Sequence, residues 1–197
     1  GRTKFDAEEK LRLWHTKSDN SLIIVRPTVI FGEGNRGNVY NLLNQIASGK
    51  FLIVGKAVNK KSMAYIKNIV AFLEACIATD QKYGLYNYVD TPDLTMNELV
   101  SQVRAQLQKK HGVGLRLPYW VGMILGFTAD AISFVTGKSL PVSSIRVKKF
   151  VSSTEFRSAK GDLDNFEAPF SLSDGLKRTL QSEFNSPDTQ REIFYTE

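Results

Sequence analysis

The residues with the clearest potential for chemistry lie in a glycine-rich loop, residues 32–37, which reads G-E-G-N-R-G. Apolar, β-branched runs at residues 22–25 and 29–31 come before it, and apolar residues at helical spacing follow from Val39 to Ala47. A strand, a glycine loop and a helix form a common ligand site in α/β proteins, because the loop and the helix N-terminus offer free N–H groups.

Two interpretations of this loop compete. Its spacing, G-x-G-x-x-G, is that of a dinucleotide-binding fingerprint. However, the next strand ends at Gly55 and Lys56 without an acidic residue, and a helix precedes the first strand. We therefore favour a loop at the carboxyl end of a later strand, lining a ligand cleft. In that cleft Asn35, Arg36 and Asn38 would donate hydrogen bonds to a phosphate or a sugar.

The elements that must position this loop alternate between helix and strand. We expect helices over residues 4–17, 38–48, 66–77, 95–110 and 172–184, and strands over residues 21–31, 51–54 and 85–89. Thr95 and Glu98 have the spacing of a capping box. Helix-then-strand steps in series predict an α/β fold with parallel pairing.

Composition narrows the class of protein. The chain has 197 residues, of which 42% are hydrophobic, and a formal net charge of +6. The basic residues alternate with acidic ones and form no stripe with exposed aromatics, which argues against a nucleic-acid partner. The single cysteine, Cys76, excludes an internal disulfide, and no residues have metal-site spacing. Nothing at the start resembles a signal peptide, so we expect a cytoplasmic location.

Residues 117–137 are apolar and aromatic, with Asp130 as the only charge. Their length is near that of a membrane span, but glycines, Thr128, Ser133 and Asp130 make them less apolar. We expect a buried or groove-lining helix, and keep an interfacial membrane helix, with weak membrane association, as the alternative. Residues 142–151, which include Arg146, should form a short basic helix or strand.

Four segments resemble motifs of the extended short-chain dehydrogenase/reductase family. Residues 1–8 (GRTKFDAE) are similar to the segment after its catalytic tyrosine in Tyr-x-x-x-Lys, and residues 26–32 (RPTVIFG) to its Arg-Pro segment. Residues 61–68 (KSMAYIKN) and 86–89 (YNYV) resemble two later motifs in the expected order. Within the family the chain looks most like nucleotide-sugar epimerases and dehydratases.

This resemblance implies a fold and a division of the chain. The fold would be the C-terminal part of a Rossmann-type extended short-chain reductase with its smaller substrate-binding domain. Residues 1–60 would be the tail of the NAD(P)-binding domain, and residues 61–197 mostly the substrate-binding portion, with a polar tail from residue 185. The catalytic tyrosine would directly precede Gly1, so we expect this chain alone to be inactive.

The resemblance also implies roles for individual residues. Lys4 stands four residues after the expected tyrosine, where it would lower the pKa of the phenol and contact the NAD or NADP ribose. Pro27 and Thr28 would lie against the nicotinamide. For substrate binding, the resemblance points to Asn38, Lys61 and Arg146, and Arg36 is the alternative to Arg146 as the second cation. The family often has arginine in place of Lys61, and lysine cannot bind a diphosphate in bidentate fashion.

The function implied is NAD(P)-dependent epimerisation or dehydration of a nucleotide sugar, in envelope polysaccharide synthesis. Two alternatives stay open. A 3β-hydroxysteroid-type dehydrogenase would use the apolar stretch 117–135 to line a lipid pocket, and a non-catalytic binding module would keep only the fold. Family members commonly dimerise through the helix with the Tyr/Lys pair, which would place residues 5–14 in a homodimer interface.

Overall fold

The computed structural model describes residues 1–49, 51–107, 114–138, 140, 143–158, 163, 165–187 and 192–195. Its helices are α1 (Arg2–Thr16), α2 (Asn38–Ala47), α3 (Ile66–Ala78), α4 (Met96–Gln106), α5 (Tyr119–Thr136), α6 (Ser144–Val151) and α7 (Leu172–Leu180). Its strands are β1 (Leu22–Pro27), β2 (Val29–Phe31), β3 (Ile53–Val54), β4 (Met63–Tyr65), β5 (Tyr83–Tyr88) and β6 (Arg116–Leu117). A π-helical turn, Gln181–Asn185, extends α7.

The strands form parallel pairs, as the sequence predicts, but in separate two-stranded sheets: β1 with β5, β2 with β4, and β3 with β6. The single strand expected over residues 21–31 is divided at Thr28, whose N–H donates to the carbonyl of Tyr88 at 3.1 Å. This break lets β1 pair with β5 while β2 pairs with β4. The chain is therefore α/β, with short parallel strand pairs instead of one continuous sheet.

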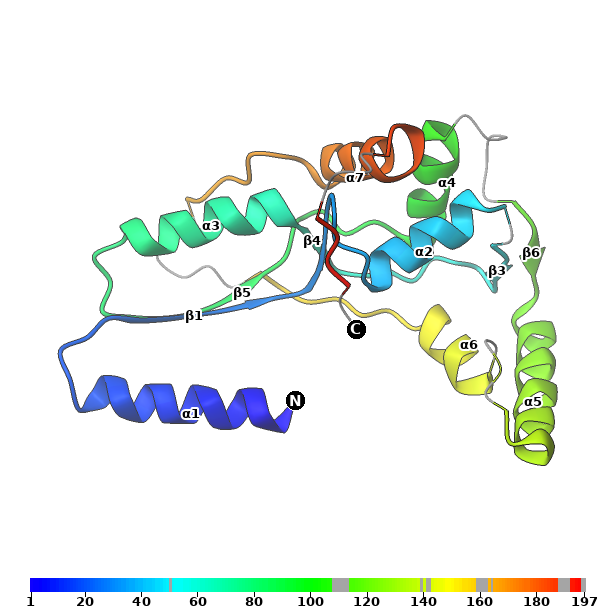
Figure 1. Ribbon diagram of the computed structural model, residues 1–197, viewed down its shortest axis with the longest axis horizontal. Helices are drawn as coiled ribbons and strands as arrows, with labels where there is room; N and C mark the ends of the chain where they lie inside the picture. Colours follow the sequence, from blue (N-terminus) through cyan, green and yellow to red (C-terminus); the bar gives the residue numbers. More distant parts are fainter. Residues whose placement is uncertain are drawn as a thin grey trace.

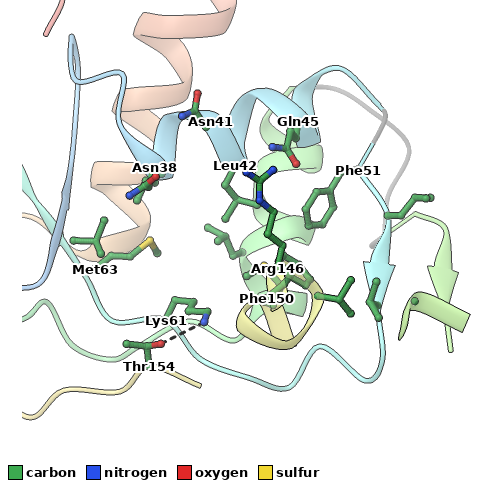
Figure 2. Close-up of a pocket in the computed structure, with 18 of the residues that line it drawn as sticks. Asn38, Asn41, Leu42, Gln45, Phe51, Lys61, Met63, Arg146, Phe150 and Thr154 are labelled. Carbon is green, nitrogen blue, oxygen red and sulfur yellow. Dashed lines mark hydrogen bonds between the residues drawn. The ribbon is translucent and has the colours of Figure 1, made fainter. Parts of the chain in front are cut away.

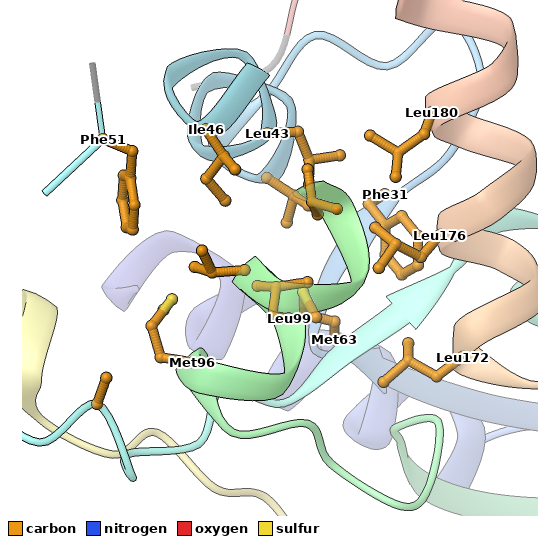
Figure 3. Packing of buried hydrophobic residues seen from close by; sticks show 14 of the residues in the cluster. Phe31, Leu43, Ile46, Phe51, Met63, Met96, Leu99, Leu172, Leu176 and Leu180 are labelled. Atoms are coloured by element: carbon orange, nitrogen blue, oxygen red, sulfur yellow. The ribbon is translucent and has the colours of Figure 1, made fainter. Parts of the chain in front are cut away.

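The main hydrophobic core lies between α2, α4, α7 and the β2–β4 pair (Figure 3). Each helix contributes one apolar face, and Leu43, Val100 and Leu180 have no exposed surface. The expected capping box starts α4: the Thr95 hydroxyl accepts from the Glu98 N–H, and the Glu98 carboxylate accepts from the Thr95 N–H. Amphipathic spacing and this cap explain why α2, α4 and α7 form where they do.

A second core packs α3 against β5 and β1. It contains Phe72, Tyr86 and Tyr88, together with Cys76, which is buried as expected. Burial raises the pKa of the Cys76 thiol above its ordinary value, as suits a core residue. In Figure 1 this part of the molecule, with α1 beside β1, lies at the end opposite to α5 and α6.

For residues 117–137 we expect a buried or a groove-lining helix, and the structure shows the second form and not the first. α5 forms, ends at Gly137 in the left-handed conformation (φ 66°), and lines a groove, but only 17% of its residues are buried. It is also long and apolar enough, by length and composition, to cross a membrane. The exposure arises because α5 packs through small residues, Gly122 and Gly126, which leave its large side chains facing outward.

Candidate functional site

A cavity of about 740 Å³ opens between α2, α5, α6 and the segment leading into β4 (Figure 2). Its lining is mainly apolar and includes Phe51, Met63, Leu99 and Phe150. A ring of polar side chains completes it: Asn38, Asn41, Gln45, Lys61, Ser62, Arg146 and Thr154. An apolar floor with a few convergent polar groups is typical of a small-molecule site.

Helix α2 supplies one wall of this pocket. Val39, Leu43 and Ile46 are buried in the core, while Asn38, Asn41, Leu42 and Gln45 line the cavity at positions i, i+3, i+4 and i+7. The same helical period thus produces a core face and a ligand face. The sequence analysis identified Asn38 but missed Asn41 and Gln45, although their three- and four-residue spacing is visible in the sequence.

Helix α6 supplies the opposite wall. Its side chain Val147 is buried, Ser143 caps its first turn by accepting from the Arg146 N–H at 3.2 Å, and Phe150 packs edge-on against Phe51 at 5.6 Å. In Figure 2 the Arg146 side chain points from α6 across the cavity toward α2. The pocket therefore places a guanidinium opposite the carboxamides of α2.

Lys61 lines the same pocket, but its ammonium contacts the end of α6. Nζ donates to the carbonyls of Lys149 at 3.0 Å and Ser152 at 2.6 Å, and to the Thr154 hydroxyl at 3.3 Å. Burial holds the pKa of Lys61 below its ordinary value. A cation at the carboxyl end of a helix is favoured by the helix dipole. The residue thus holds α6 in place.

None of the residues of the glycine loop, residues 32–37, lines this cavity, contrary to the sequence-based expectation. The Gly34 N–H donates to Glu183 at 2.8 Å, and Arg36 lies 3.5 Å from the same carboxylate. Glu33 accepts from the Tyr65 hydroxyl at 2.9 Å and pairs with Lys67 at 3.2 Å. The loop accordingly binds the α7 region, and Arg36 is not among the residues that line the pocket.

Lys4, Pro27 and Thr28 also lie outside the pocket lining. Arg26 Nε donates to Glu8 Oε1 at 2.9 Å, which ties exposed α1 to β1. α1 runs antiparallel to β1 (Figure 1), so Lys4, one turn before Glu8, lies at the Pro27 end of β1. Lys4 is exposed there. The Thr28 hydroxyl oxygen is buried and has no hydrogen-bond partner among the described residues.

Apart from Arg36, which lies beside Glu183, the predicted site residues fall into two groups. Asn38, Lys61 and Arg146 meet in one cavity, although they come from three separate segments. Lys4, Pro27 and Thr28 share another place, at the carboxyl end of β1. This separation is what a protein needs when one ligand approaches β1 and a second ligand occupies the cavity.

No family model matches the chain. The N-acetyl-alpha-D-glucosaminyl-diphospho-ditrans,octacis-undecaprenol 4-epimerase of Escherichia coli O157:H7 is 53% identical over 187 residues, which cover 93% of this chain and 56% of that protein.

Two solved structures share the fold at low sequence identity. UDP-N-acetylglucosamine 4-epimerase from Bacillus cereus has a TM-score of 0.66 at 12% identity, covering 98% of this chain and 56% of that one. UDP-glucuronic acid 4-epimerase from Bacillus cereus, in complex with NAD, has a TM-score of 0.55 at 15% identity, covering 90% and 49%.

The chain spans about half the length of these relatives. Three observations agree with the resemblance to short-chain reductases: the order of the motifs in residues 1–89, the parallel α/β fold, and the 53% identity to a protein named as an epimerase. The chain therefore has the Rossmann-type fold of the extended short-chain dehydrogenases/reductases, is similar to a protein named as a 4-epimerase, and corresponds to about half of such a protein.

Proposed function

We propose that the pocket binds the sugar and diphosphate of an activated sugar, within an NAD(P)-dependent 4-epimerase. The observation that carries the proposal is the opposition of Arg146 to Asn38, Asn41 and Gln45 across an apolar floor. Carboxamides donate to and accept from sugar hydroxyls, and a guanidinium binds phosphate oxygens in bidentate fashion. The name of the 53% identical relative supports epimerisation over dehydration.

Residues at the carboxyl end of β1 fit a nicotinamide cofactor. The buried Thr28 hydroxyl has no partner among the described residues, so it is available to one from outside the chain. In this proposal Pro27 and Thr28 contact the cofactor and Lys4 binds its ribose. A bound NAD or NADP would supply hydride exchange with the sugar carbon. The ammonium of Lys4 would also stabilise a neighbouring phenolate base and so lower its pKa.

The sugar is carried, we infer, by a polyprenyl diphosphate instead of a nucleotide. The Escherichia coli relative is named for such a substrate. The cavity supports the same choice, because its floor consists of Leu42, Phe51, Leu99 and Phe150 and it reaches Leu125 on exposed α5. An apolar wall that continues to the surface suits the first prenyl units of a lipid carrier.

The proposal also assigns a role to each of the two parts of the chain. Residues 1–60, with β5 paired to β1, would complete the cofactor-binding half, and most of residues 61–197 would hold the substrate. The reaction would take place on the cytoplasmic side, where nicotinamide cofactors are available.

Thermal unfolding of the chain with three ligands tests this function. We expect a GlcNAc-diphospho-polyprenol with a shortened prenyl chain to raise Tm by about 5–10 °C at about 100 times its Kd. UDP-GlcNAc at the same concentration should raise Tm by a smaller amount. Arg146→Gln should weaken binding about tenfold. The matched control is Arg157→Gln, because Arg157 is exposed and does not line the cavity.

A rise in Tm with a sterol, and with neither sugar ligand, would instead support the hydroxysteroid alternative.

A further inference from the structure

The outward side of α5 presents a continuous row of large apolar side chains. Trp120, Ile124, Phe127 and Phe134 follow one another at helical spacing, with exposed fractions of 66%, 53%, 56% and 92%. Val135, beside them, is 83% exposed. These five residues define what we call the α5 face. Exposed apolar rows of this size on a protein surface mark interaction sites.

The other side of α5 is fixed to the folded domain. A Cβ at Gly126 would lie 2.7 Å from the Ser144 Cα, and one at Gly122 would lie 2.6 Å from the Val54 side chain, so α6 and β3 approach the bare backbone of α5. Asp130 Oδ2 accepts from the Ser144 N–H at 3.1 Å. The glycines and Asp130 thus hold the helix, and the α5 face is what this packing leaves uncovered among the described residues.

Charge around the α5 face is strongly positive. From Arg116 to Val151 the sequence has five basic residues and one acidic residue, Asp130, which is the one bound to Ser144. Lys138 follows α5 directly, and Lys148 and Lys149 are exposed on the adjoining α6. A helix with tryptophan and phenylalanine on one side and basic residues next to it is the composition of an interfacial membrane helix.

We propose that the α5 face docks on an anionic lipid bilayer, with α5 lying along the membrane surface. The apolar side chains would enter the boundary of the acyl chains, and Lys138, Lys148 and Lys149 would contact the headgroups. A spanning orientation is disfavoured because α6 packs along α5 and would carry Lys148 and Lys149 into the hydrocarbon.

Docking in this orientation brings the pocket to the membrane. Leu125 is half-exposed on α5 and also lines the cavity. Gly122, about one turn earlier on α5, lines the cavity as well. α5 and α6 lie at the end of the molecule away from α1 and β1 (Figure 1), so the cofactor end would point toward the aqueous phase. The inference does not rest on the proposed substrate, since binding to a bilayer requires no sugar.

Sedimentation of the chain with lipid vesicles tests the proposal. We expect binding to vesicles of phosphatidylglycerol and phosphatidylcholine, and about tenfold weaker binding to phosphatidylcholine alone or at high salt. Phe134→Glu should weaken binding about tenfold or more, because it places a carboxylate in the docked face. Ile77→Glu, which changes a residue 84% exposed on α3, is the matched control and should bind like the unchanged chain.

Three results would overturn the proposal. The first is equal sedimentation of the Phe134→Glu and unchanged chains. The second is resistance of the bound chain to extraction by alkaline carbonate, which would indicate a spanning helix. The third is a dimer that Phe134→Glu dissociates without any vesicle binding, which would assign the face to a second copy. Loss of sugar binding with vesicle binding intact would refute only the proposed function, so the two failures are distinguishable.

Discussion

The carboxamide of Asn68 pairs with both backbone polar groups of Phe170: Nδ2 donates to the carbonyl at 2.8 Å, and Oδ1 accepts from the N–H at 3.0 Å. Asn68 has no exposed surface. The pair connects α3 to the segment that enters α7, and Phe170 in turn packs edge-on against Tyr65 at 5.6 Å. One amide therefore holds together two parts of the chain that lie 102 positions apart.

Replacement of Asn68 by aspartate should destabilise the fold. The carboxylate keeps the bond from the Phe170 N–H but opposes the Phe170 carbonyl, at a cost of about 1–3 kcal/mol. A protonated acid can donate to that carbonyl, so the folded-state pKa should rise. Stability should then be highest below the ordinary carboxyl pKa, about 4, and should fall as pH rises through the raised value. Urea unfolding across pH measures this.

Asn87→Asp is the matched control for that prediction. Asn87 is exposed on β5, so its aspartate should show an ordinary pH dependence. Equal pH dependence of the two variants would show that the Asn68 pair does not stabilise the α3–α7 connection.

Detachment of α1 should depend on pH through Glu8. The hydrogen bond from Arg26 is the main reason that the pKa of Glu8 lies below its ordinary value. The attachment is therefore complete above the ordinary carboxyl pKa and is lost as pH falls through the depressed value. Because α1 has no buried residues, the remainder should stay folded. The protection factors of the α1 amides, which compare the observed hydrogen exchange with the intrinsic rate at the same pH, should fall at acid pH and lose that dependence in Glu8→Gln.

Glu9→Gln supplies the comparison, since among the described residues the ion-pair partner of Glu9 is Arg12 of its own helix, at 3.5 Å. Its α1 amides should keep the acid-dependent exchange. If both variants behave alike, helix fraying and not the Glu8–Arg26 pair controls the exchange.

Gly175→Ala should destabilise the main core, although alanine favours helices more than glycine does. A Cβ at Gly175 would lie 2.6 Å from Tyr65 Cγ, and Tyr65 cannot retreat because its ring is fully buried and its hydroxyl bonds to Glu33. Overpacking of this kind costs about 1–3 kcal/mol, more than the gain of about 1 kcal/mol in helix propensity. Chemical unfolding should show the loss, and Lys177→Ala, exposed on the same helix, should be near neutral.

Local sequence patterns predicted the elements that have strong local signals. The stripe of α3 and the Thr95–Glu98 cap of α4 each depend on residues within two turns of each other, so the sequence contains them. β4 was missed because three residues, Met63–Tyr65, are too few to show alternation, and they are buried on both sides. The exposure of α5 was missed because composition gives the apolar content of a helix but not how much of it neighbours cover.

The site was predicted less completely than the fold. Asn38, Lys61 and Arg146 share a cavity only through tertiary packing, and the family resemblance, not spacing, suggested them. Asn41 and Gln45 look like the solvated side of an amphipathic helix until α6 is seen opposite. Even for Lys61, the sequence could not show that its three donors are already engaged, since their acceptors lie 88 to 93 positions away.

Lys61 is therefore expected to act on the ligand indirectly, through α6. Lys61→Met would leave the carbonyls of Lys149 and Ser152 without this donor, which should cost about 1–3 kcal/mol and loosen the wall that carries Arg146. Affinity for a sugar diphosphate should fall, while the salt dependence of binding stays that of the unchanged chain, because no charge contact with the ligand is lost. Arg146→Gln should lower the affinity and also weaken the salt dependence of binding, because the guanidinium is proposed to contact the diphosphate. Titration calorimetry at several salt concentrations separates the two roles: a reduced salt dependence in Lys61→Met would show that its ammonium contacts the diphosphate directly.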